Sequence, residues 1–282
     1  FFVRRTAPAA FSAGWEKLAN GVRGVIPVEI PRIVSIIRKE EQQELILFPR
    51  IPPFEHPEVD YHVHYFTEVD RAFIGEALGR RAALLPQMSD VFSKYGLPDD
   101  LLNLAFIESR FKPWARSPRG GTLGLWQFAK ETGREYGLRV GKNGRDNRHD
   151  VEMSTDAAAR HLIDLFDMFG DWYLVAAAYN CGKNRVKRAI EIAGTDDIYV
   201  LASRGLISGI TRAYVGRFAA ITQIMMSPES YGFPNVDPDP KLFRWILEAP
   251  EKDEQDTAEH DDLEAENSVK QKAEKKRRHS PR

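Results

Sequence analysis

Residues 98–111 have the sequence PDDLLNLAFIESRF, which predicts a short helix that carries an acid on its apolar face. Pro98 suits the first helical position, and the two acids after it are favoured by the positive end of the helix dipole. The apolar face is formed by Leu101, Leu104 and Ala105. Glu108 follows these residues at helical spacings of seven, four and three, so we expect its carboxyl group on the buried side.

A carboxyl group in this position is expected to have a raised pKa. Glu108 falls in the last turn before Phe111, where the negative end of the helix dipole disfavours a carboxylate. Burial acts in the same direction, and a carboxyl group that stays protonated near neutral pH is what a general acid requires. The alternative is a structural carboxylate that pairs with Arg110 or another base, and the residues alone leave both interpretations open.

Around this helix, the patterns of the chain predict four regions. Prolines interrupt the first region, whereas the second is helical in pattern almost throughout, with at most a short hairpin near 117–125. We therefore expect a mainly helical fold. The regions are an N-terminal extension at 1–57 with one helix between its prolines, a helical domain at 58–227, a C-terminal packing segment at 228–250 and a disordered charged tail at 251–282.

The composition argues against several kinds of site and partner. The 282 residues include 40 Lys and Arg against 41 Asp and Glu, so the chain lacks the positive field that a nucleic-acid partner needs. Cys181 is the single cysteine, which rules out an intrachain disulfide and a Cys-based metal cluster. His62 and His64 are two residues apart, on different faces of a helix, with no third ligand nearby. We expect neither a metal nor a cofactor.

The sequence shows neither a membrane helix nor an export signal. No stretch approaches the roughly 18 consecutive apolar residues that a membrane helix needs, and the first residues lack an apolar signal region. The chain begins with Phe1 in place of Met, so we expect a processed or trimmed form whose export signal has been removed. Membrane association is expected only through such a removed segment.

Two more stretches contain side chains suited to a sugar polymer. In residues 120–128, GGTLGLWQF, Trp126 offers a flat apolar face and Gln127 offers both a donor and an acceptor. A glycine-rich turn that packs an aromatic ring into the core is the alternative. A helix is predicted from Trp172 to about Tyr179, with Gly170 as the C′ residue of the helix before it and Asp171 as its N-cap. Tyr179 and Asn180 stand at its end, where they would face a cleft or serve as a core tyrosine and a helix C-cap.

The charged residues between these stretches allow two interpretations. Basic residues outnumber acids from Arg110 to Arg148, which suits an acidic polymer but is also typical of a solvated surface. The acids beside the motifs, Glu131, Asp146 and Asp150, lie in polar contexts and not on an apolar face. The His149–Asp150 pair has no recognisable nucleophile around it.

The three motifs together resemble those of the soluble lytic transglycosylase family. They are Glu108-Ser109-Arg110-Phe111-Lys112-Pro113-Trp114-Ala115-Arg116-Ser117, then Gly124-Leu125-Trp126-Gln127-Phe128, then Ala177-Ala178-Tyr179-Asn180-Cys181-Gly182. The resemblance extends over about 61–226. It implies a lysozyme-like, mainly helical fold and cleavage of the MurNAc–GlcNAc bond of peptidoglycan with formation of 1,6-anhydro-MurNAc.

The resemblance also assigns roles to residues. Glu108 would be the catalytic acid, and the substrate would be bound by Ser117, Gln127, Tyr179, Asn180 and Tyr214. Two positions depart from the family pattern. Cys181 stands where the family usually has Ala, and Ile210 stands where its fourth motif has Glu, which leaves open how Tyr214 is held.

A single acid fits this chemistry. Most glycosidases need two carboxylates, but one suffices where the acetamido group of the substrate assists. Glu108 would protonate the leaving oxygen and then deprotonate the attacking 6-hydroxyl. The alternatives are a goose-type lysozyme that delivers water, with Asp150 as the candidate base, and a glycan-binding pseudoenzyme. We expect a monomer that binds peptidoglycan strands in the periplasm or cell envelope.

Overall fold

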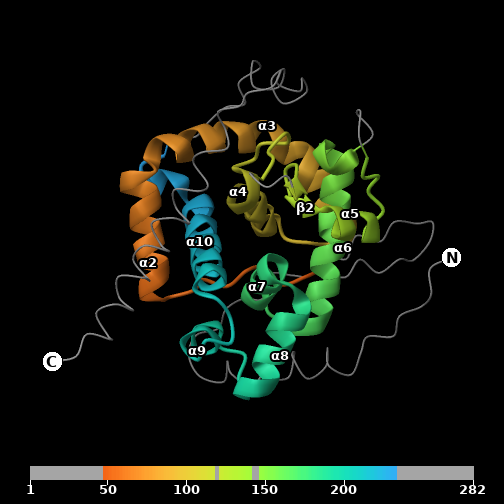
Figure 1. Ribbon diagram of the computed structural model, residues 1–282. Coiled ribbons are helices and arrows are strands. Elements are labelled where there is room, and N and C mark those ends of the chain that lie inside the picture. The colour runs from red at the N-terminus through yellow and green to blue at the C-terminus, as the bar shows by residue number, and fades with distance from the viewer. Residues whose placement is uncertain (1–46, 118–120, 142–145, 234–282) are drawn as a thin grey trace. The chain divides into compact units, whose positions relative to one another are not determined.

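The computed structural model describes residues 47–117, 121–141 and 146–233 (Figure 1). The helix predicted between the N-terminal prolines, most of the predicted C-terminal packing segment and the predicted tail lie outside these residues. Within the described part of the chain, helices dominate and there is a single two-stranded antiparallel sheet. This confirms the predicted mainly helical fold class. None of the described helices is long and apolar enough to cross a membrane.

The described residues form two compact units, each with its own set of predicted site residues. The acid unit, named for Glu108, consists of the described parts of 52–161 together with 216–233. The amide unit, named for Asn180, consists of 47–51 and Leu162–Val215. The domain boundaries expected from the sequence stay predictions.

The acid unit is built from helices and a short hairpin. Its elements are α2 (Pro57–His64), the π-helix η1 (Tyr65–Val69), α3 (Arg71–Tyr95), the 3-10 helix η2 (Asp99–Leu102), α4 (Asn103–Ser109), β1 (Thr122–Leu123), β2 (Phe128–Ala129), α5 (Lys130–Glu135), and the 3-10 helices η3 (Asn147–His149) and η4 (Pro228–Tyr231). Two helices belong to both units by sequence, α6 (Val151–Phe169) and α10 (Gly209–Met226). The amide unit also contains α7 (Trp172–Cys181), α8 (Lys183–Ala193) and α9 (Ile198–Ser203).

The hairpin lies slightly later in the chain than the sequence predicted. Thr122 pairs with Ala129 and Leu123 with Phe128, so the second strand falls beyond the expected range of 117–125. The turn between the strands occupies 124–127, and Gln127 completes it with a left-handed backbone at φ 47°. The displacement arises because this turn is four residues long and places its left-handed residue just before β2.

Trp126 belongs to the core of the acid unit. Its side chain is fully buried and stacks on Phe92, with ring centroids 5.8 Å apart. The indole Nε1 donates a hydrogen bond to Thr155 Oγ1 at 3.0 Å. Of the two interpretations left open by the sequence, the structure supports the aromatic packed into the core, because a fully buried ring offers no face to a sugar.

The core of the amide unit forms around α7, where every residue from 172 to 178 is buried. The sequence predicted both ends of the α6–α7 connection. Gly170 follows α6 with φ 64°, and the Asp171 carboxylate accepts hydrogen bonds from the backbone N–H groups of Tyr173 and Leu174 at 2.8 and 2.9 Å. The helix continues two residues past its predicted end, to Cys181. Tyr179 and Asn180 therefore lie in its last turn.

Candidate active site

Glu108 lies in the last turn of α4, as predicted, and its side chain is half-buried. The start of this segment differs from the prediction, because Pro98 is the extended N-cap of η2 and a 3-10 turn precedes α4. Arg110, the partner proposed for a structural glutamate, forms its ion pair with Asp70, with Nη2 3.1 Å from Oδ2. Its guanidinium also lies over the ring of Phe73, 4.8 Å from the centroid. The Arg110 interpretation of Glu108 is therefore not supported.

The chain leaves α4 through a strained corner. Arg110 and Phe111 both have left-handed backbones, at φ 50° and 59°, which non-glycine residues adopt at a cost of about 1–3 kcal/mol each. Surrounding contacts hold this conformation. The buried Arg80 donates from Nε to the Arg110 carbonyl at 2.8 Å, and the Phe111 side chain is fully buried. Strain of this kind is concentrated at functional sites, and here it begins two residues after the acid.

Ser109 connects the end of α4 to the hairpin turn. Its buried hydroxyl lies 2.7 Å from the carbonyl oxygen of Leu125 and 3.0 Å from that of Ala105. The backbone N–H of Lys112 donates to the same hydroxyl at 3.2 Å. The position of Glu108 is thus fixed relative to the hairpin that contains the next two predicted site residues.

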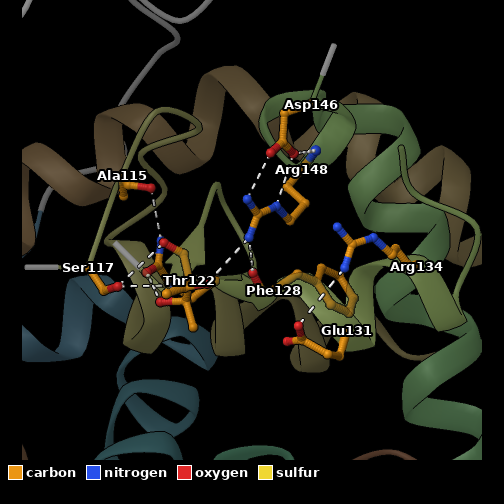
Figure 2. A network of polar contacts seen from close by, with 10 residues as sticks. Ala115, Ser117, Thr122, Phe128, Glu131, Arg134, Asp146 and Arg148 are labelled. Carbon is orange, nitrogen blue, oxygen red and sulfur yellow. Dashed lines mark hydrogen bonds and ion pairs between the residues drawn. The ribbon is translucent and has the colours of Figure 1, made fainter. Parts of the chain in front are cut away.

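Ser117 and Gln127 both bind Thr122, so the structure brings them together on the hairpin (Figure 2). The Ser117 hydroxyl accepts from the Thr122 backbone N–H at 3.0 Å, and the Thr122 hydroxyl donates to Gln127 Oε1 at 2.7 Å. Gln127 Nε2 donates to the carbonyl oxygens of Ala115 and Gly124, at 3.1 and 2.7 Å. Both amide hydrogens of Gln127 therefore brace the turn, and its predicted contact with substrate stays a prediction.

A buried ion pair that sequence reasoning missed supports the same hairpin. Arg148 donates from Nε and Nη2 to the two carboxylate oxygens of Asp146, at 2.9 and 2.7 Å, with side chains only 4% and 9% exposed. The remaining nitrogen, Nη1, donates to the carbonyl oxygen of Phe128 in β2 at 2.9 Å (Figure 2) and to that of Gly121, just before β1, at 3.4 Å. Arg148 is therefore buried and does not belong to a solvated basic face.

Close packing adds to this support. A Cβ atom built on Gly124 would lie 1.8 Å from the Arg148 carbonyl oxygen, so only glycine fits there. Although burial opposes ionisation, hydrogen bonds from Arg148 lower the pKa of Asp146. Both charges are therefore present at neutral pH, and a two-stranded hairpin that would be marginal alone is held by one guanidinium.

The neighbouring His149–Asp150 pair serves other purposes. The Asp150 carboxylate accepts from the backbone N–H of Met153 at 2.8 Å, which makes it a cap at the start of α6. The His149 ring lies 4.6 Å from the Trp114 ring, centroid to centroid. Burial, together with the charge of Arg116, lowers the pKa of His149. Both side chains have structural roles that need no catalytic dyad.

In the amide unit, Tyr179 is half-buried and Asn180 is exposed at the end of α7. Asn180 Oδ1 accepts a hydrogen bond from the hydroxyl of Thr211, on α10, at 2.9 Å. Tyr214, one turn further along α10, is only 3% exposed. Its predicted contact with substrate is untested, but its side chain lies almost entirely in the core.

The two departures from the family pattern lie beside Thr211. Ile210 is 51% exposed, so the position of the missing acid faces solvent. Burial raises the pKa of Cys181, and a hydrogen bond with the Thr211 side chain partly offsets this. The thiol is therefore protonated at neutral pH, and a reactive thiolate is disfavoured.

The predicted site residues thus fall into two groups. The acid unit contains Glu108, Ser117 and Gln127, connected through Ser109 and Thr122. The amide unit contains Tyr179, Asn180 and Tyr214. Among the described residues, no group of three or more His, Cys, Asp or Glu side chains could hold a metal ion.

Comparison with known proteins places these residues in a common context. Residues 92–201 match the family model described as the transglycosylase SLT domain. Over 164 residues the chain is 36% identical to membrane-bound lytic murein transglycosylase D of Escherichia coli (strain K12). The aligned stretch covers 56% of this chain and 35% of the relative. Over 93 residues it is 43% identical to the peptidoglycan transglycosylase gp16 of Escherichia phage T7, covering 32% of this chain and 7% of that protein.

A solved structure shows a more distant likeness. It is an inactive mutant of the lytic transglycosylase Slt from Pseudomonas aeruginosa, with 24% identity and a TM-score of 0.41 over 56% of this chain and 25% of that one. The chain spans about a third of the length of the Escherichia coli relative.

Proposed function

We propose that this chain is a peptidoglycan lytic transglycosylase, because residues 92–201 match the family model described as the transglycosylase SLT domain. The observation that carries the proposal is the content of the matched segment. It includes Glu108, Ser117, Gln127, Tyr179 and Asn180, the residues to which the motifs assign substrate contacts. The substrate is the glycan strand of peptidoglycan, and the chain acts on it as a monomer in the periplasm or cell envelope.

Glu108 is the acid in this proposal, because the other carboxylates near the motifs have structural contacts or are exposed to solvent. Asp146 is bound by Arg148, and Asp150 caps α6. Glu131 has a side chain that is 84% exposed and faces Arg134 at 3.9 Å. A half-buried glutamate at the negative end of a helix has the environment that favours a protonated acid.

The reaction needs no second carboxylate. Glu108 gives its proton to the glycosidic oxygen as the bond to the anomeric carbon of MurNAc breaks, and GlcNAc leaves with a new 4-hydroxyl group. As this bond breaks, the acetamido oxygen of MurNAc forms a bond to the anomeric carbon. The Glu108 carboxylate then takes the proton of the MurNAc 6-hydroxyl, whose oxygen displaces the acetamido oxygen and closes the 1,6-anhydro ring. Glu108 ends protonated, ready for the next cycle.

The hydrolase alternative needs a base that activates water. Asp150 was its candidate, and the hydrogen bond from Met153 N–H gives that carboxylate a capping role instead. This contact favours the transglycosylase over the lysozyme-type reaction.

Digestion of purified sacculi by wild type and Glu108→Gln tests the assignment. We expect the variant to lose roughly 100- to 10,000-fold in the rate of muropeptide release, which is the typical contribution of a general acid and base. Its melting temperature should stay close to that of wild type, because the substitution keeps the shape of the side chain. Glu131→Gln, which removes an exposed carboxylate, is the matched control and should keep full activity. A rate for Glu108→Gln within about tenfold of wild type would overturn the assignment.

A further inference from the structure

The side-chain amide of Asn180 is held at one end only. Its oxygen accepts a hydrogen bond from Thr211 Oγ1 at 2.9 Å, and the side chain has no other hydrogen-bond partner among the described residues. Asn180 is exposed, whereas Thr211 is 1% exposed. The two hydrogens of Nδ2 are therefore available to a ligand, and the atom that fixes the amide comes from a buried residue.

The neighbours of Thr211 determine which end of the amide it binds. Its hydroxyl lies 3.0 Å from Ser208 Oγ, and Ser208 Oγ already accepts from the Thr211 backbone N–H at 3.1 Å. Because Thr211 donates its own hydrogen to Asn180 Oδ1, the Ser208 hydroxyl is the donor in its contact with Thr211 Oγ1.

With Ser208 as the donor to Thr211 Oγ1, the hydrogen of the Thr211 hydroxyl is directed to Asn180, and it requires an acceptor. Only the oxygen end of the Asn180 amide is an acceptor. An amide with its nitrogen toward Thr211 would place donor against donor and lose this hydrogen bond, which costs about 1–3 kcal/mol where the group is buried.

We propose that Thr211 is a positioning residue that holds the Asn180 amide with its oxygen toward α10 and its NH₂ group toward the glycan strand, so that position 180 recognises an acceptor oxygen of the sugar. The inference rests on the proposed function and deepens it.

A double-mutant cycle tests the proposal. Thr211→Val keeps the volume of the side chain and removes the hydroxyl, and we expect it to raise KM for glycan strands about threefold to tenfold with a smaller change in kcat, as the loss of one hydrogen bond predicts. Thr211→Ser keeps the hydroxyl and should restore most of the loss. In an Asn180→Ala background, Thr211→Val should have no further effect on KM, because the group it positions is absent.

The variant Asn180→Asp is a second, independent test. It keeps an oxygen for Thr211 and replaces the outward NH₂ group by an acceptor, so KM should rise at least as much as in Thr211→Val while the melting temperature changes little. A Thr211→Val effect on KM that persists unchanged in the Asn180→Ala background would overturn the inference, as would an unchanged KM in Asn180→Asp.

The test separates this inference from the proposed function. If wild type releases no muropeptides, the proposed function is wrong, and calorimetric affinity for purified glycan strands then decides the inference. Equal affinity of wild type and Thr211→Val would contradict it.

Discussion

The acid unit and the amide unit hold their predicted site residues by different physical means. In the acid unit, Gln127 lies in the turn of a two-stranded hairpin and Ser117 binds the first strand of that hairpin, which is braced by a buried ion pair between Arg148 and Asp146. In the amide unit, Tyr179 and Asn180 lie in the last turn of a regular helix, and neutral hydroxyl groups complete the hydrogen bonding. One group of residues is held by charge and the other by a helix.

The backbone shows the same contrast. Within the described part of the chain, the non-glycine residues with positive φ are Arg110, Phe111 and Gln127, and all three belong to the acid unit. Strained backbone persists only where surrounding contacts over-determine it. The acid unit therefore needs its side-chain contacts to keep its geometry, whereas α7 keeps Asn180 in place through ordinary helical hydrogen bonds.

Removing the buried guanidinium of Arg148 should have the largest effect on the stability of the acid unit. Arg148→Met leaves the Asp146 carboxylate buried without its partner, which should lower the free energy of unfolding by about 3–5 kcal/mol. Denaturant titration measures the loss. Arg134→Met is the matched control, because Arg134 forms an exposed pair with Glu131 and its loss should change stability by less than about 1 kcal/mol. Equal losses in the two variants would show that the hairpin does not depend on the buried pair.

The pH dependence of stability also reports on the ion pair between Asp146 and Arg148. The folded-state pKa of Asp146 is lowered, so the ion pair contributes stability that is fully present above the ordinary aspartate pKa of about 3.9. This contribution is lost as the pH falls through the lowered folded-state value. Unfolding free energies measured from pH 7 to pH 2 should therefore fall less steeply for Asp146→Asn, which has no carboxylate to titrate, than for wild type. Parallel curves would mean that the pKa of Asp146 is not lowered.

A smaller effect is expected in the amide unit. Asp171→Ala removes the cap of α7, and caps of this kind contribute about 1 kcal/mol. We expect a loss of that size in thermal unfolding, with glycan affinity nearly retained, because the hydrogen bond between Asn180 and Thr211 lies at the other end of the helix. A loss as large as that of Arg148→Met would remove the distinction between the two units.

The sequence predicted the amide unit better than the acid unit, and the reason is physical. Helical periodicity and capping residues are local signals, so the helix that begins at Trp172, the cap Asp171 and the terminator Gly170 could all be found. The position of Glu108 in the last turn of its helix was found in the same way.

The braces of the hairpin could not be found from local patterns. Arg148 binds the carbonyl oxygens of residues 20 and 27 positions earlier in the chain, and such contacts leave no periodic pattern. Its neighbours in the sequence are polar, and a basic run of this kind is also typical of a solvated surface. The one local signal was an aspartate two residues before it, since Asp146 and Arg148 form their pair across that spacing. Trp126 was ambiguous for a similar reason, because its burial depends on Phe92 and Thr155 from distant helices.

The mass of the sugar ends that wild type releases from purified sacculi tests the central claim most directly. If the 6-hydroxyl of MurNAc is the nucleophile, mass spectrometry of the muropeptides will show 1,6-anhydro-MurNAc ends, each one water lighter than a reducing end. A digest dominated by reducing MurNAc would mean that water attacks the anomeric carbon, and it would contradict the transglycosylase reaction assigned to Glu108.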